Sequence, residues 1–120
     1  MTTYVVLLPG DESTWERATP AQRAETYETH GRFAAMLAER GHKITGGEEL
    51  THTRSAKQVR RDAAGKVLVS DGPFAETVEQ LTGFYVVESD DLDDLLEVCG
   101  LLANSDVPIE VRAAVDHGGE

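Results

Sequence analysis

Short apolar runs alternate with longer polar or amphipathic stretches along the chain, and this pattern predicts a mixed α and β fold. The first apolar run, Tyr4 to Leu8, ends at Pro9 and Gly10 and predicts a central strand. The following segment, Gly10 to Ala18, is mostly polar apart from Trp15. We expect a loop there, with the indole covering an edge of the core or the rim of a pocket.

A long amphipathic helix is predicted from Pro20 to Arg40. Its start combines Thr19 as N-cap, proline at the first helical position and Gln22 three residues after the cap. Gly41 supplies the stop. The expected apolar stripe consists of Tyr27, Phe33, Ala34 and Leu37. His30 falls within this stripe, so its imidazole is expected to face the sheet.

The middle of the chain predicts a strand followed by a hairpin. His42 to Leu50 contains an apolar residue and two adjacent glycines, which indicates a short strand with a bulge or a close backbone approach. Ala56 to Asp62 and Lys66 to Ser70 flank a glycine-containing loop, as the two strands of a hairpin do. Val67 and Val69 are expected on one face of that hairpin.

Next comes a cluster of helix and strand breakers, Asp71, Gly72 and Pro73, which leaves Asp71 at the mouth of a strand. Phe74 is expected to turn toward the core. The spacing of Ala75, Val78 and Leu81 predicts a short helical piece that ends at Gly83, and the run from Phe84 to Val87 predicts a strand buried on both faces.

The last third predicts a second long helix, capped by Ser89 or Asp90, and a final strand from Ile109 to Val115. Four aspartates crowd the first turn of this helix, where the helix dipole favours acidic groups without any metal ion. Cys99 lies in the apolar stripe and is interpreted as a small buried hydrophobe rather than a nucleophile. The stripe as a whole comprises Leu92, Leu95, Leu96, Cys99 and Leu102.

This order of elements suits an α+β fold in which both main helices cover one face of an antiparallel sheet. The other face would then be apolar and exposed unless something covers it. A second copy of the chain is the simplest cover, so we expect a homodimer with a cavity between two sheets.

Length and charge limit the possible functions. With 120 residues the chain forms a single domain, residues 1–120. It holds 22 acidic and 11 basic residues and therefore carries a net charge of −11, which makes nucleic acid an unsuitable partner. No apolar run approaches the roughly 20 residues of a membrane span, so we expect no membrane contact and a soluble cytoplasmic protein.

The segment DGPFAET, followed by EQL, a glycine and FYVVE, resembles the signature of the DGPF group of YCII-related proteins. Further segments fall where that pattern places them: GDESTW, HGRF, GGEEL and IEVRAAV. The likeness covers nearly the whole chain. It implies a ferredoxin-like antiparallel sheet that pairs into a dimeric α/β barrel, and it implies no assigned reaction.

His30 and Asp71 are the candidate catalytic pair. Histidine exchanges protons near neutral pH, and a carboxylate fixes its tautomer and stabilises its cation. The resemblance implies such a histidine and aspartate dyad, while the plain alternative is a core histidine bonded to a backbone carbonyl beside an aspartate that caps its own turn. Tyr4, Tyr85 and Glu88 are candidate ligand-binding residues, because their strands are expected to line the same cavity.

The sequence offers no support for a metal ion or a cofactor. The other histidines show no paired spacing, and the chain has no Walker loop, GxSxG elbow or GxGxxG motif. Two functions therefore remain. One is a cofactor-free proton-transfer enzyme, a lyase or an isomerase, that acts on a small organic molecule with His30 as base. The other is a dimer that binds a small molecule, or regulates, without chemistry.

Overall fold

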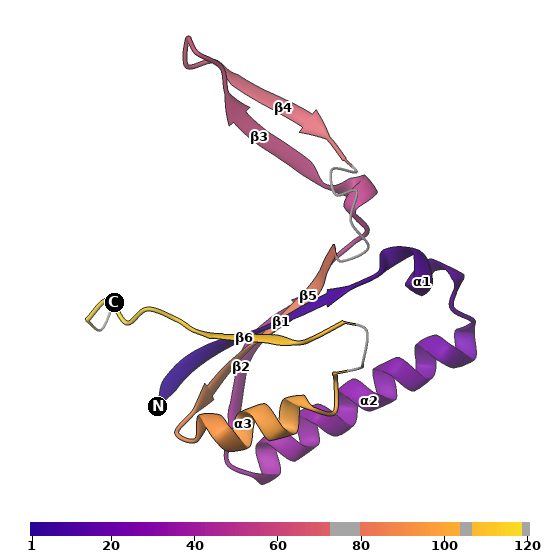
Figure 1. Cartoon of the computed structure of the whole chain (residues 1–120), viewed down its shortest axis with the longest axis vertical. Coiled ribbons are helices and arrows are strands. Elements are labelled where there is room, and N and C mark those ends of the chain that lie inside the picture. Colours follow the sequence, from indigo (N-terminus) through magenta and orange to yellow (C-terminus); the bar gives the residue numbers. More distant parts are fainter. Residues whose placement is uncertain (73–79, 104–106, 119–120) are drawn as a thin grey trace.

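The computed structural model describes residues 1–72, 80–103 and 107–118, and it contains a four-stranded antiparallel sheet, helices against one face and a separate two-stranded hairpin (Figure 1). The strands of the large sheet are ordered β2-β5-β1-β6, a ferredoxin-like α+β arrangement as expected. In chain order the elements are β1 (Thr2–Gly10), α1 (Glu12–Arg17), α2 (Pro20–Glu39), β2 (Lys43–Glu49), η1 (Thr53–Ser55), β3 (Lys57–Arg61), β4 (Val67–Asp71), β5 (Gln80–Ser89), α3 (Leu92–Cys99) and β6 (Glu110–Ala113).

The core lies between the large sheet and the helices α2 and α3. In the pairing of β1 with β5, Tyr4 is opposite Val87 and Val6 is opposite Tyr85, so these four side chains project from the same face. Both helices pack on that face, as predicted. The buried core residues are Val6, Phe33, Leu37, Val87, Leu95, Val98 and Cys99. Burial raises the pKa of the Cys99 thiol to about 11, so Cys99 acts as the small hydrophobe that the sequence indicates.

Helix α2 begins at the predicted residue, but fewer of its side chains are buried than the predicted apolar stripe contained. The Thr19 hydroxyl accepts from the backbone N–H of Gln22, and the Gln22 side chain accepts from the backbone N–H of Thr19, which completes a capping box. Gly41 ends the helix with φ +86°, a conformation that glycine adopts without strain. Tyr27 does not belong to the buried stripe, because it is 52% exposed.

The expected loop from Gly10 to Ala18 is wrong, because Glu12–Arg17 forms the short helix α1. Asp11 caps this helix by accepting from the backbone N–H of Ser13. Six residues are too few to display a helical apolar period, which explains why the pattern suggested a loop. Trp15 is half-buried, with its ring 5.6 Å from the Tyr27 ring and under the Arg23 guanidinium.

The short helical piece expected to end at Gly83 is also wrong where the structure describes it. Leu81 and Gly83 both belong to β5, which begins at Gln80. A side chain at position 83 would come within 2.8 Å of the Glu48 carbonyl oxygen, so the glycine allows β2 to approach rather than ending a helix. Pro73, Phe74, Ala75 and Val78 lie outside the described residues.

Helix α3 is shorter than the pattern predicted. Its cap is Asp91, which accepts from the backbone N–H of Asp94, rather than Ser89 or Asp90. The hydroxyl of Ser89 instead bonds the buried ring of His42. The helix ends at Cys99, and two leucines of the expected stripe are about half exposed, Leu92 at 40% and Leu96 at 45%. The final strand likewise covers four residues of the predicted seven.

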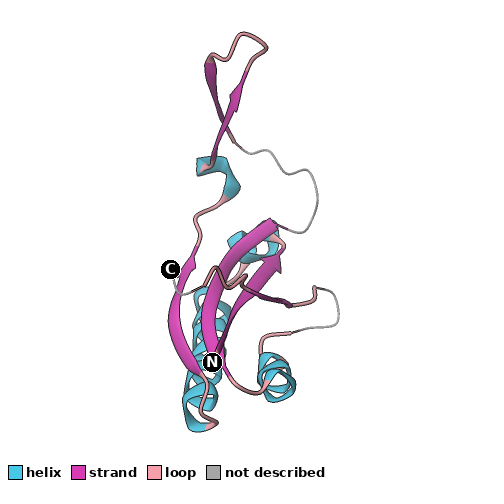
Figure 2. Cartoon of the chain, turned by 90° about the vertical axis from the view of Figure 1, so that its left-hand side faces the viewer, coloured by secondary structure: helices cyan, strands magenta, loops and turns pink. Residues whose placement is uncertain are grey.

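Strands β3 and β4 form an arm, Lys57–Asp71, that extends away from the rest of the protein (Figures 1 and 2). The two strands pair with each other in a two-stranded sheet of their own, as the predicted hairpin does. The backbone N–H of Gly72 donates to the Ala56 carbonyl at 2.7 Å and closes the base of the arm. Every residue of β3 is exposed, and so are four of the five in β4.

The second face of the large sheet carries no helix in the part of the chain that the structure describes. Val5 and Leu7 project from this face, opposite Val86 and Phe84 on the neighbouring strand. A shallow hollow on it is lined by Val5, Leu7, Arg112 and Ala113. None of the described helices has the length and apolar composition needed to cross a bilayer.

Candidate functional site

Helix α2 brings His30 onto Tyr85 of strand β5. The Nδ1 atom of His30 lies 2.7 Å from the Tyr85 hydroxyl, and the two rings are 5.8 Å apart. One turn along the helix, Phe33 packs on the same tyrosine with ring centroids 5.1 Å apart. Because Phe33 is buried, it holds the Tyr85 ring in place under the histidine.

A glycine in the neighbouring strand makes room for this tyrosine. Gly47 of β2 is paired with Tyr85 and has φ +148°, which L-residues rarely adopt. A side chain at position 47 would come within 3.2 Å of the Tyr85 ring and 2.6 Å of the Phe84 carbonyl oxygen. Gly47, the second glycine of GGEEL, therefore shapes the strand and also leaves the space in which Tyr85 is positioned.

Glu49, at the end of β2, adds a carboxylate to the site. The hydroxyl of Tyr27 donates to Glu49 at 3.1 Å, and the Glu49 charge also acts on His30. Tyr27 precedes His30 by three residues, so the two project from neighbouring positions of α2. We call these four residues the histidine cluster: Tyr27, His30, Glu49 and Tyr85.

The surroundings keep His30 neutral and Tyr85 protonated. Burial lowers the pKa of His30 below its ordinary value of 6.5, and the negative charge of Glu49 partly offsets this effect. Burial raises the pKa of Tyr85 above 10. At neutral pH the pair therefore consists of an uncharged imidazole bonded to an uncharged phenol, and the imidazole is able to accept a proton.

His30 differs from the two other partly or fully buried histidines in having one ring nitrogen that makes no hydrogen bond or ion pair with the described residues. His42 uses both nitrogens, one toward Ser89 at 2.8 Å and one toward Asp94 at 2.7 Å. His52 also uses both, since Nδ1 accepts from the Arg54 backbone and Nε2 lies 2.8 Å from Glu16. Among the hydrogen bonds and ion pairs of the described residues, none involves Nε2 of His30, which leaves this atom for a ligand.

Asp71 lies apart from His30 within one chain. It is the last residue of β4, at the mouth of a strand as expected, and its carboxylate forms an ion pair with Lys57 across the arm. No hydrogen bond or ion pair of the described residues joins it to His30. The direct partner of the histidine is Tyr85, one of the residues that the sequence suggested for ligand binding.

The other two candidate ligand-binding residues lie on opposite faces of the sheet. Tyr4 packs against the core on the helix-covered face, together with Tyr85. Glu88 follows Val87 in β5 and projects from the open face. Within a single chain the three residues therefore do not share one face, because adjacent strand residues point to opposite faces, and their role in ligand binding stays a prediction.

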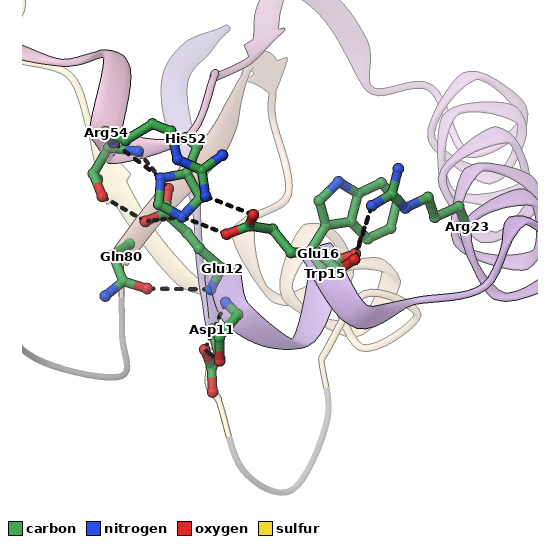
Figure 3. Close-up of polar contacts among 10 residues, drawn as sticks. Asp11, Glu12, Trp15, Glu16, Arg23, His52, Arg54 and Gln80 are labelled. Carbon is green, nitrogen blue, oxygen red and sulfur yellow. Dashed lines mark hydrogen bonds and ion pairs between the residues drawn. The ribbon is translucent and has the colours of Figure 1, made fainter. Parts of the chain in front are cut away.

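A second polar cluster joins α1 to the base of the arm (Figure 3). The carboxylate of Glu12, only 8% exposed, accepts from the backbone N–H of Thr53 at 2.9 Å and from its hydroxyl at 2.7 Å. The Glu12 backbone N–H donates to the side chain of Gln80 at 3.2 Å. Beside them, Glu16 pairs with both His52 and Arg54. We call this set the clasp: Glu12, Glu16, His52, Thr53, Arg54 and Gln80.

The clasp fixes the start of the arm and the start of β5 to the body of the protein. The nearby Arg54 and His52 hold the pKa of Glu16 below its ordinary value, with the hydrogen bond from Arg54 as the largest cause. Both glutamate carboxylates and both ring nitrogens of His52 are engaged within the protein, so we assign the clasp a structural role in positioning this segment. The sequence patterns gave no role to Glu12, Glu16 or His52, although Glu12 lies within the segment GDESTW and Glu16 directly follows it.

Replacing Glu49 with glutamine tests the electrostatics of the histidine cluster. The substitution removes the negative charge that raises the pKa of His30, so this pKa is expected to fall further below 6.5. NMR titration of the His30 ring measures the shift. Glu48→Gln removes a carboxylate from the preceding strand position, which faces the other way, and is expected to leave the His30 titration nearly unchanged. Equal shifts in both variants contradict the assignment.

Among the described residues, no three histidine, cysteine, aspartate or glutamate side chains are arranged to hold a metal ion.

Comparison with known proteins gives two findings. Residues 2–100 match the YCII-related domain. An uncharacterised protein of Rhizobium meliloti is 33% identical over 102 residues, which cover 85% of this chain and 81% of that protein.

Proposed function

The chain belongs to the YCII-related family, and from this premise we propose that it is a cofactor-free enzyme that transfers a proton on a small organic molecule. The observation that carries the proposal is the state of His30. Its Nδ1 is held by the Tyr85 hydroxyl at 2.7 Å, while Nε2 has no partner among the described residues. A neutral imidazole with one nitrogen fixed and one open has the form of a general base.

In the proposed reaction, Nε2 of His30 takes a proton from a carbon or a hydroxyl group of the substrate. The reaction requires the tautomer in which the Nδ1–H of His30 donates to the Tyr85 oxygen, 2.7 Å away, because Nε2 is then unprotonated. The nearby Glu49 carboxylate stabilises the imidazolium that forms. Return of the proton to another atom of the same molecule gives an isomerase, and departure of a leaving group with the bond electrons gives a lyase.

Asp71 keeps a proposed catalytic role only between two copies of the chain. Within one chain its carboxylate is paired with Lys57, and Nδ1 of His30 is occupied by Tyr85. A second copy would have to bring its own Asp71 close to the His30 ring without covering Nε2, so that the carboxylate charge stabilises the imidazolium. Tyr4 and Glu88 remain predicted ligand contacts, and the homodimer and the cytoplasmic location remain predictions from the sequence.

A second candidate function is ligand binding or regulation without chemistry. The observation that favours it is the open face of the sheet, where Val5 and Leu7 line a shallow, mainly apolar hollow beside Arg112. Such a hollow suits a small apolar ligand between two copies of the chain. His30 lies on the opposite, helix-covered side and would take no part in that binding.

Hydrogen exchange at carbon tests the proposed chemistry without a known substrate. We expect the protein to catalyse deuterium incorporation next to the carbonyl group of at least one compound in a panel of small ketones, keto acids and lactones, followed by NMR in D2O. His30→Gln is expected to reduce this rate by roughly 100-fold or more, the contribution typical of a general base. His117→Gln, in the exposed C-terminal segment, serves as control and should keep the full rate.

The pH dependence gives a second readout of the same experiment. The base form of His30 accumulates as pH rises through its pKa, which burial places below 6.5. Exchange should therefore increase with pH and level off before neutrality. Binding of a panel compound without exchange, at equal affinity in the His30→Gln variant, would favour the ligand-binding function instead.

A further inference from the structure

The arm exposes an apolar surface that nothing in the described part of the chain covers. In the register of β3 with β4, Val59 is paired with Val69, and Val67 is paired with Arg61, so the three valines share one face. Their exposed fractions are 68% for Val59, 60% for Val69 and 49% for Val67. A two-stranded hairpin with both faces in water is marginally stable at best, so this arm is expected to gain stability from a partner.

The protein also exposes more surface than a chain of its size normally does. Its accessible surface is 8357 Å², whereas a folded monomer of 13.0 kDa is expected to expose about 6300 Å². The radius of gyration is 16.9 Å, compared with about 14 Å for a compact domain of this length. The excess of about 2000 Å² is comparable to the area that each chain contributes to a large homodimer interface.

Charge distinguishes the arm from the rest of the chain. The arm contains four basic and two acidic residues and has a net charge of +2. The remaining residues include seven basic and twenty acidic ones, so they carry −13. An arm with an apolar centre and basic flanks is therefore complementary to the acidic body of another copy of this same chain.

The clasp holds the arm in its extended direction before any partner arrives. Glu12 binds the backbone and the hydroxyl of Thr53, directly before β3, and Glu16 pairs with Arg54 (Figure 3). An arm that is already oriented loses less conformational entropy on association than a free one.

We propose that the arm of each protomer binds the body of a second copy, with the face formed by Val59, Val67 and Val69 against it and the basic side chains over its acidic surface. This inference goes beyond the sheet-to-sheet contact expected from the sequence, because it assigns the association to the arm. It does not depend on the chemistry of His30.

Sedimentation of the full chain tests the proposal. We expect the unaltered protein to be a dimer at micromolar concentration. Val59→Asp combined with Val69→Asp should raise the dimer dissociation constant at least about tenfold, because it places charges at the centre of the contact. The matched control is Gln58→Asp combined with Ser70→Asp, an adjacent cross-strand pair on the other face of the arm with the same change in charge. This control should leave the dissociation constant nearly unchanged.

Thermal unfolding checks that both double variants are folded. We expect them to be, because the substituted residues lie outside the core. Raising the salt concentration should also weaken the dimer of the unaltered protein. A monomer at all concentrations overturns the proposal, and so does a dimer that both double variants leave intact. Neither measurement involves hydrogen exchange at carbon. A negative result here therefore contradicts the proposed role of the arm and leaves the proposed enzyme activity to its own experiment.

Discussion

Replacing Phe33 with alanine is expected to lower the free energy of unfolding by about 3 to 5 kcal/mol, the usual range for a buried phenylalanine. Phe33 is completely buried between α2 and the sheet, and its ring packs on Tyr85 at 5.1 Å. The cavity left behind cannot close without moving the helix. Chemical denaturation, with the midpoint and slope fitted separately, measures the loss.

The same substitution should also disturb the candidate site. Without Phe33 the Tyr85 ring loses its support, water reaches His30, and the pKa of His30 should rise toward 6.5. Val115→Ala is the control, since Val115 is 75% exposed and should change stability by less than about 0.5 kcal/mol. If stability falls but the His30 titration is unchanged, Phe33 does not support the Tyr85 ring at the candidate site, and this prediction is wrong.

Replacing Gly47 with alanine is the second change with a large expected effect. The backbone there has φ +148°, and a non-glycine residue in such a conformation costs about 1 to 3 kcal/mol from the backbone alone. The new Cβ would also lie 2.6 Å from the Phe84 carbonyl oxygen, which is backbone and cannot rotate away. Strand β2 must therefore move relative to β5, and Tyr85 must move with it.

Gly31→Ala is a matched control for this prediction, because it adds the same methyl group next to His30 in open space. Nothing lies within 4 Å of the added atom, and alanine favours a helix over glycine by up to about 1 kcal/mol. Denaturation should show Gly47→Ala destabilised and Gly31→Ala slightly stabilised. The Nδ1 to Tyr85 contact, followed by NMR of the His30 ring, should change in the first variant alone. Two equally stable variants would contradict the close approach of β2 to β5.

The family resemblance and the local patterns identified much of the framework. The capping box at Thr19 and Gln22, the stop at Gly41 and the bulged strand at the glycine pair all follow from residues close together in the chain. The hairpin that became the arm was also predicted, because a glycine-containing loop between two strand-like segments is a local signal. Short helix α1 and the true cap of α3 were missed, since several polar residues in a row offer more than one possible cap.

The candidate site could be predicted only in part. The sequence identified His30 and Tyr85 as separate candidates, but it paired His30 with Asp71 and placed Tyr85 with Glu88. Within one chain the His30 ring meets Tyr85, and strand register places Glu88 on the open face while Tyr85 projects toward α2. Glu49 carried no distinguishing signal, because a glutamate at the end of a strand is usually a solvated surface residue.

The sequence by itself determined most of the elements, much of the apolar core and a histidine on the sheet-facing side of α2, because periodicity and capping act over a few neighbouring residues. The tertiary structure alone decided which group meets that histidine and where the arm extends. His30 and Tyr85 are 55 residues apart, and their contact depends on the helix crossing, on the register of β2 with β5 and on the space left by Gly47. Such distant contacts are set by packing, which no local pattern of residues encodes.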